Sequence, residues 1–265
     1  MTPLPGALTP LAMRTHLRVA RLRHQAGGLP RLLTPQAVRA LGLSFASPVL
    51  LAAGFDRHGA LFDAATALGF GAIENGSFTC SDGPVPPLLL RWPRRRRLIR
   101  GISLRLPAGP PVTARENVLR WLLALHRHAD YLTLNPGGQR MAPDAVAALT
   151  ADAARQLASL SCGPAPALVV KLSADGASPR ALREQARRLI DAGAQGLLLS
   201  HETSPAVLDC IATVAAACPD SALISVGGLR DAAQIRERLA AGAALVQVHR
   251  ALTGDPVRAC RRLRT

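Results

Sequence analysis

A repeated pattern of short apolar runs, most of them followed by a helix-forming segment, extends through most of this chain. The last unit is the clearest. The β-rich run 223–226 ends in Gly227-Gly228, a helix is expected over 231–240, and a second apolar run follows at 245–248. Strands joined through a helix lie parallel, because the crossover carries the chain back to the end from which it started. Adjacent glycines after a strand let backbone N–H groups approach a phosphate closely, although a simple tight loop would use them too.

Eight such units predict a closed (β/α)8 TIM barrel, an α/β fold, and a doubly wound open sheet is the structural alternative. The expected strands are 49–53, 71–75, 102–104, 131–134, 168–172, 196–199, 223–226 and 245–248. The expected helices are 60–68, 115–128, 143–160, 179–192, 205–217, 231–240 and 255–264. Residues 79–100 contain four prolines and the arginine run Arg94–Arg97, so we expect an extended, solvated loop there.

Composition narrows the class of protein. The 265 residues suffice for one barrel of this kind, which needs about 250 residues. Hydrophobic residues make up 49% of the chain and aromatic ones only 3%, so the core must be built from Leu, Ala and Val. The formal net charge of +15 attracts anions. The basic residues are scattered, however, and aromatics for base stacking are scarce, which argues against nucleic acid as a partner. The five cysteines form no CxxC pair, so we expect small buried hydrophobes and no metal site.

Residues 1–41 are expected to form a short N-terminal helical extension, and residues 42–265 the barrel. Helices are expected at 11–25 and 35–41, the second with a threonine cap and a proline at its first position.

The segment 11–25 can place Met13, Leu17 and Ala20 on one face, with arginines between them. This pattern is typical of an anchor on an anionic membrane surface, and the alternative is a pair of helices packed against the bottom of the barrel. No apolar run reaches the length of about 18 residues that spans a membrane, and there is no convincing signal peptide. We therefore expect a cytoplasmic protein that can lie peripherally on the inner face of the cell membrane.

In a barrel of this type the functional site lies at the carboxyl ends of the strands. Those ends form a polar, glycine-rich rim: Gly54-Phe55-Asp56-Arg57, Gly76-Ser77, Arg105, Asn135-Pro136-Gly137-Gly138, Ser200-His201-Glu202, Gly227-Gly228 and His249-Arg250. Lys171 differs because it lies inside the apolar run 168–172. A lysine that points into a barrel is costly unless it meets an anion or a hydrogen-bond acceptor. The alternative is a lysine near the strand end that reaches solvent.

With these residues placed, the chain resembles the dihydroorotate dehydrogenase family, in particular its membrane-associated, quinone-using class. The resemblance rests on LAAGFDRHG after the first strand, GFGAIENGSFT, YLTLN, VVKLSAD, GAQGLLLS, ISVGG and AAGAALVQVHRAL, in this order. It implies FMN bound across the barrel mouth and a quinone as electron acceptor. By position, the residues that would line the flavin are Ala53, Gly54, Ser77, Asn135, Lys171, Ser200, Gly227, Gly228, His249 and Arg250.

Within that resemblance, two groups have particular roles. Gly227-Gly228 and the backbone near His249-Arg250 would hold the flavin phosphate. Lys171 would lie beside the N1–C2=O edge of the flavin, where a cation stabilises the reduced ring.

The chain departs from the family on the substrate side. The serine that removes a proton from dihydroorotate is replaced by Gly138, and the asparagine-containing segment before the third strand, which contacts orotate, is essentially absent. Where the family has a lysine after the first glycine turn, this chain has Arg57. Where the family has an Asn-Thr pair after the sixth strand, this chain has His201-Glu202. A glycine-bearing flavin loop after that strand is also missing. We expect Arg57, Asn135, His201 and Glu202 to contact the substrate, with Lys171 and His201 as the catalytic side chains.

Two classes of function follow. The first is an FMN-dependent oxidoreductase of pyrimidine biosynthesis, acting on dihydroorotate or on a related small molecule. The second is a degenerate barrel that has lost the activity and serves as a non-enzymatic or differently specific protein. Retention of the flavin-side residues favours the first class.

Overall fold

The structure is a computed structural model that describes residues 33–56, 61–80, 84–85, 87–90, 98–106, 111–137, 141–160, 163–201, 206–252 and 256–264. Eight parallel strands form a closed barrel in the order β10-β3-β4-β5-β6-β7-β8-β9. Closure is made by β10 and β3, where Val246 pairs with Val49. The predicted TIM barrel is therefore confirmed, and the open sheet is wrong. The strands are β3 Val49–Leu51, β4 Ala72–Thr79, β5 Ile99–Arg105, β6 Tyr131–Asn135, β7 Ala167–Ser173, β8 Gly196–Ser200, β9 Ala222–Val226 and β10 Leu245–Val248.

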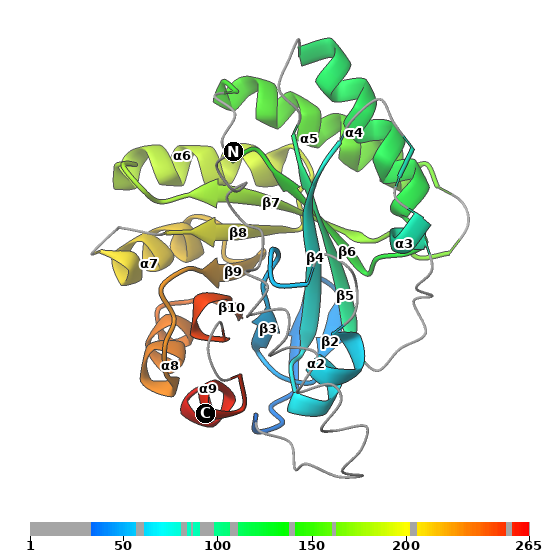
Figure 1. The fold of residues 1–265 in the computed structure, drawn as a ribbon. Helices are drawn as coiled ribbons and strands as arrows, with labels where there is room; N and C mark the ends of the chain where they lie inside the picture. The colour runs from blue at the N-terminus through cyan, green and yellow to red at the C-terminus, as the bar shows by residue number, and fades with distance from the viewer. Residues whose placement is uncertain are drawn as a thin grey trace, which may run out of the picture.

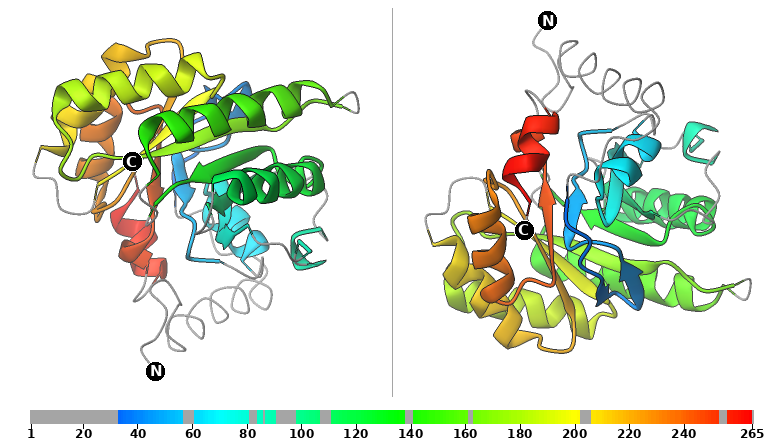
Figure 2. Two further views of the ribbon diagram at one scale, coloured as in Figure 1. Left: turned by 90° about the horizontal axis from the view of Figure 1, so that it is seen from above. Right: turned by 90° about the horizontal axis from the view of Figure 1, so that it is seen from below.

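Helices surround the ring of strands, as Figures 1 and 2 show. They are α2 Phe62–Leu68, α3 Pro87–Leu90, α4 Pro111–Leu125, α5 Pro143–Ala158, α6 Pro179–Asp191, α7 Val207–Ala217, α8 Ala232–Ala240, the 3-10 turn η1 Arg250–Leu252 and α9 Pro256–Arg262. Helix α6 begins where Ser178 accepts a hydrogen bond from the backbone N–H of Ala181, and Pro179 takes its first position. Helix α8 begins in the same way at Asp231, which accepts from the N–H of Gln234.

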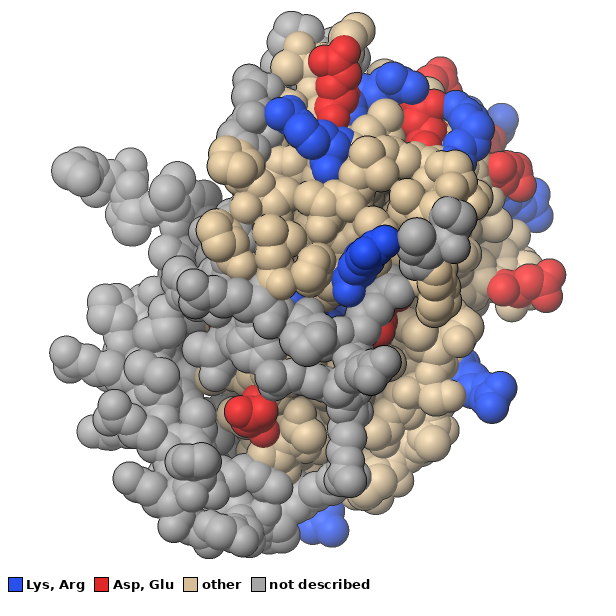
Figure 3. Space-filling model, turned by 90° about the vertical axis from the view of Figure 1, so that its right-hand side faces the viewer, with Lys and Arg blue, Asp and Glu red and all other residues tan. Residues whose placement is uncertain are grey.

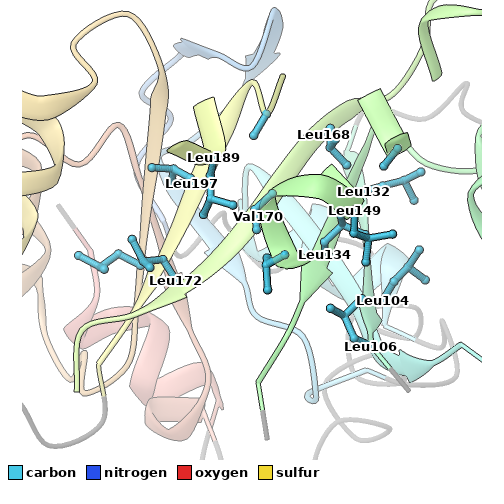
Figure 4. Packing of buried hydrophobic residues seen from close by; sticks show 14 of the residues in the cluster. Leu104, Leu106, Leu132, Leu134, Leu149, Leu168, Val170, Leu172, Leu189 and Leu197 are labelled. Carbon is cyan, nitrogen blue, oxygen red and sulfur yellow. The ribbon is translucent and has the colours of Figure 1, made fainter. Parts of the chain in front are cut away.

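The main core lies between the strands and the helices. Leu104, Leu132, Val170 and Leu197 extend outward from neighbouring strands and meet helix residues such as Leu149 (Figure 4). A smaller core fills the amino-terminal half of the barrel interior, where Tyr131 is fully buried. Both cores consist mainly of Leu, Ala, Val and Ile, as the composition requires. The four described cysteines are buried and free.

The predicted helix at 35–41 is wrong. Residues Val38–Ala40 form strand β1, which pairs antiparallel with β2, Leu43–Phe45. The two residues between them, Leu41 and Gly42, both have positive φ angles, 54° and 69°, as a two-residue hairpin turn requires. Apolar side chains of the hairpin pack against the interior core of the barrel, and this burial overrides the local helix signals.

Two further expectations at the start of the chain concern residues that the structure covers only in part. The predicted helix at 11–25 lies outside the described residues. The boundary expected between 41 and 42 falls within the hairpin turn.

The expected loop at 79–100 is partly ordered. Within it, Pro87–Leu90 forms helix α3, and β5 begins at Ile99, three residues before the predicted start. Arg94–Arg97 lie outside the described residues. In this segment a single helical turn packs Leu89 into the core. The prolines in the segment had favoured an extended loop instead.

The described surface carries charges of both signs. On the face shown in Figure 3, basic and acidic side chains lie interspersed over the tan surface. Asp152, for example, pairs with both Arg115 and Arg155. Within the described part of the chain, no helix has the length and apolar character needed to cross a membrane.

Candidate active site at the carboxyl ends of the strands

A cavity of about 1180 Å³ opens at the carboxyl ends of the strands, and all eight strands or the turns after them contribute to its wall. Every predicted site residue that the structure describes lies on this wall: Ala53, Gly54, Ser77, Asn135, Lys171, Ser200, His201, Gly227, Gly228, His249 and Arg250. Arg57 and Glu202 lie outside the described residues. The structure therefore brings the eleven described residues together, while their roles stay predictions.

The glycine turn after β9 packs closely against the chain that follows β8. Gly227 has a φ of +112°, and a Cβ built there would lie 1.9 Å from the backbone oxygen of His201. Only glycine therefore fits, and the chain after β8 closes against the turn. Gly228 also has a positive φ, and helix α8 begins shortly after it. Backbone N–H groups and the positive end of a helix together favour an anion at such a turn.

On the neighbouring rim, Gly54 and His249 lie against one another. Gly54 has a φ of +94°, and a Cβ there would lie 3.4 Å from Nε2 of His249. The imidazole also meets the ring of Phe55 edge-on, with 6.0 Å between the ring centroids. These contacts fix the histidine ring at the wall of the cavity.

Glu74, on β4, is a buried acid in the cavity that the sequence analysis missed. Its Oε2 accepts hydrogen bonds from Nε2 of Gln247 at 2.8 Å and from Oγ1 of Thr133 at 3.2 Å. Burial raises the pKa of Glu74, while its hydrogen bonds and the charge of Lys171 oppose the rise. A lone acid after the apolar run Gly71–Ile73 is the same kind of signal that singled out Lys171, and it could have found Glu74.

Lys171, on β7, lines the same cavity and lies close enough for its charge to act on Glu74. It is the only lysine in the sequence, in a chain with 32 basic residues. The predicted position inside the barrel is thus where the structure places it. The other 31 residues of the Lys and Arg total are arginines, so the compact ammonium of Lys171 is specific to this cavity.

A chain of hydrogen bonds links three neighbouring strands of the cavity wall, β4, β5 and β6. Nδ2 of Asn135 donates to Oγ of Ser77 at 2.9 Å, and the hydroxyls of Ser77 and Ser103 lie 2.8 Å apart. Oδ1 of Asn135 accepts from the backbone N–H of Gly137 at 3.0 Å. Asn135 is 4% exposed, so these bonds hold its amide in one orientation. Ser103, like Glu74, was not among the predicted site residues.

His201 lies at the edge of the cavity with its ring buried. Its Nε2 lies 3.3 Å from Oγ of Ser225, and Nη1 of Arg238 donates to the same oxygen at 3.4 Å. Burial, and next the charge of Arg238, lower the pKa of His201 to about 4. The imidazole is therefore neutral at neutral pH. Burial also lowers the pKa of Arg238 to about 10.

Positive charge predominates in the cavity. Among the described residues of its wall, the basic side chains besides histidine are Arg105, Lys171, Arg230, Arg250 and Arg262, and the acidic ones are Glu74 and Asp231. Asp231 caps helix α8, and burial favours the neutral form of Glu74. A wall of this kind attracts an anionic ligand.

Comparison with known proteins identifies relatives of the chain. No protein-family model matches it. The dihydroorotate dehydrogenase (quinone) of Anaeromyxobacter dehalogenans strain 2CP-1 is 32% identical, over 90% of this chain and 80% of the relative. The enzyme of the same name from Anaeromyxobacter sp. strain Fw109-5 is 31% identical, over 90% and 85%. Among solved structures, ligand-free DHODH from Eimeria tenella superposes with a TM-score of 0.74 at 21% identity, covering 94% of this chain and 92% of the other.

Proposed function

The chain belongs to the dihydroorotate dehydrogenase (quinone) family, and from that premise we propose that it is an FMN-dependent oxidoreductase. Its substrate would be dihydroorotate or a related small cyclic acid, in pyrimidine biosynthesis or close to it, and its electron acceptor a quinone. The observation that carries this proposal is Lys171. The only lysine of an arginine-rich chain lies in an electropositive cavity at the end of a parallel barrel, beside a buried acid.

The cavity fits a flavin nucleotide in two respects. Gly227 and Gly228 carry no side chain and lie on the cavity wall just before helix α8, so backbone N–H groups can approach a phosphate there. The small residues Ala52, Ala53 and Gly54 keep the rim beside it free of bulk. FMN bound in this cavity would accept the electrons that leave the substrate and pass them to a quinone.

The side chains would divide the work by position. Lys171 would place its ammonium beside the polar edge of the flavin ring, where developing negative charge is stabilised in a site with little water. Asn135, held by Ser77 and by the N–H of Gly137, would orient the substrate. His201 is neutral at neutral pH and so can accept a proton, although its pKa of about 4 makes it a weak base.

A second candidate function is a barrel without redox activity, serving as a binding or scaffold protein. The observation that favours it is the sequence at the substrate side, where Gly138 offers no hydroxyl to remove a proton. Loss of a general base lowers a rate by a factor of roughly 10² to 10⁴. An oxidoreductase without that base should therefore still turn over its substrate slowly, whereas a scaffold protein should show no turnover.

The visible spectrum of the purified protein tests the proposal. We expect a flavin absorbance in the blue, which a barrel without flavin lacks. Lys171→Ala should lower the flavin content or the rate at which the bound flavin is reduced, and Lys171→Arg should restore the charge but not the shape. Arg39→Ala, an exposed change on the hairpin at the other end of the barrel, is the control. A colourless protein, or an unchanged spectrum and unchanged reduction kinetics in Lys171→Ala, would contradict the proposal.

A further inference from the structure

We propose that Arg105 is the residue with which this chain recognises the anionic group of its substrate, and that this group is a carboxylate bound on the side of the cavity opposite the Gly227-Gly228 turn. This inference rests on the proposed function and deepens it, because it names the side chain that selects the acidic substrate.

The position of Arg105 is fixed by its backbone. It is the last residue of β5, in register with Thr79 on β4 and Asn135 on β6. Its carbonyl oxygen accepts a hydrogen bond from the N–H of Cys80 at 3.1 Å. The side chain therefore starts from a rigid strand end and lines the cavity. A group on such an element can hold a ligand in one geometry.

One N–H group of the Arg105 guanidinium, at Nε, has no hydrogen-bond acceptor among the described residues. Its Nε is buried, and no acceptor among the residues that the structure describes lies within hydrogen-bonding distance of it. A buried donor without a partner destabilises the protein, and more so when it is charged. Arginine cannot lose its proton to avoid that cost. A ligand anion in the cavity would supply the missing acceptor.

The place of β5 in the ring separates this anion site from the glycine turn. In the closed order of eight strands, β5 and β9 are four steps apart in either direction, so they lie on opposite sides of the barrel. A phosphate on the Gly227-Gly228 turn therefore leaves Arg105 available for a second anion.

The surroundings of Arg105 favour a planar carboxylate. A guanidinium presents paired N–H groups that match the two oxygens of a carboxylate. Next to it, Asn135, Ser77 and Ser103 form the hydrogen-bonded chain that can meet ring carbonyl and N–H groups. The two acids of the described cavity wall are engaged elsewhere: Asp231 caps helix α8, and Glu74 accepts hydrogen bonds from Thr133 and Gln247.

Calorimetric titration of the protein as purified tests the inference. The probes are orotate, a ring acid, and uracil, the same ring without the carboxylate. The variants are Arg105→Gln, which removes the charge, and Arg105→Lys, which keeps it but loses the paired geometry. Arg39→Gln removes one charge from the exposed hairpin at the other end of the barrel and serves as the control. Flavin content is read for each protein from its visible absorbance, and folding from its circular dichroism.

We expect the wild type to prefer orotate over uracil. Arg105→Gln should weaken orotate about 10- to 100-fold and leave uracil unchanged, Arg105→Lys should fall between, and Arg39→Gln should behave as the wild type. If Arg105→Gln does not fold, Arg105→Lys decides, because full orotate affinity in that variant counts against paired recognition. Wild-type protein that fails to bind orotate, or shows no preference for it, overturns the inference, as does orotate binding that Arg105→Gln leaves unchanged.

The outcomes separate this inference from the proposed function. Flavin-loaded protein whose orotate binding is independent of Arg105 refutes the anion site and keeps the oxidoreductase. Protein without flavin whose orotate binding depends on Arg105 keeps the anion site and refutes the oxidoreductase.

Discussion

Replacing Gly227 by alanine should damage both the stability of the barrel and the seat for an anion. The added Cβ would lie 1.9 Å from the backbone oxygen of His201, and a backbone atom cannot move aside as the end of a flexible side chain can. The strand end and the chain after β8 would have to separate. We therefore expect Gly227→Ala to shift the N–H groups of the turn and to lower flavin content together with stability.

The magnitude follows from two contributions. A residue other than glycine in a left-handed conformation costs about 1–2 kcal/mol. Forcing an extra carbon into a packed site costs about 1–3 kcal/mol more. Gly227→Ala should therefore lower the free energy of unfolding by roughly 2–5 kcal/mol.

Two other glycines supply matched controls. Gly176 has a φ of +73° and no atom within 4 Å of the place that a Cβ would take, and Gly228 has a φ of +65° with only the guanidinium of Arg238, at 3.6 Å. Gly176→Ala and Gly228→Ala should therefore show only the conformational cost of about 1–2 kcal/mol. Urea unfolding followed by circular dichroism gives all three values. If Gly227→Ala unfolds no more easily than the two controls, the close approach to His201 does not constrain the turn.

Three further predictions concern titration and the N-terminus. Burial raises the pKa of Glu74 above its usual value of 4.5, so the folded protein holds this proton more tightly than the unfolded chain, and stability falls as pH rises above 4.5. Glu74→Gln should therefore gain stability relative to the wild type as the pH rises, and an unchanged difference between the two proteins in urea unfolding at every pH would contradict this. His201 behaves in the opposite way, because its pKa is lowered from 6.5 to about 4 and the unfolded chain therefore binds a proton at a higher pH than the folded protein. Acidification from pH 6.5 to pH 4 should lower the free energy of unfolding by about 3 kcal/mol through this group. His201→Gln should lack that loss in the same urea assay. Replacing Arg14, Arg18, Arg21 and Arg23 by glutamine should weaken binding to anionic vesicles in a flotation assay, and salt should weaken wild-type binding; equal binding by both proteins would argue against the proposed membrane anchor.

The positions of Glu74, Arg105 and His201 show what the sequence left open. Glu74 is recognisable as a lone acid after an apolar run, but its partner Gln247 is 173 residues away. The sequence places Arg105 at a strand end. Only the packing of the neighbouring strands shows that its Nε is buried with no acceptor among the described residues. His201 was expected at the rim, where the structure finds it. Its contact with Ser225 and the burial that lowers its pKa, with the charge of Arg238 second, come from the packed structure.

The sequence by itself determined the architecture and the location of the candidate site, because both depend on a periodic signal repeated along the chain. Alternating apolar runs and helices require parallel strands, and closure of parallel strands brings their carboxyl ends around one cavity. Local signals failed at 35–41, where a capping threonine and a proline indicated a helix. There the positive φ angles of Leu41 and Gly42 and the burial of the hairpin against the interior core gave two strands instead. Tertiary structure alone decided such features, because the free energy of burying a segment and the identity of its partners come from residues far away in the chain.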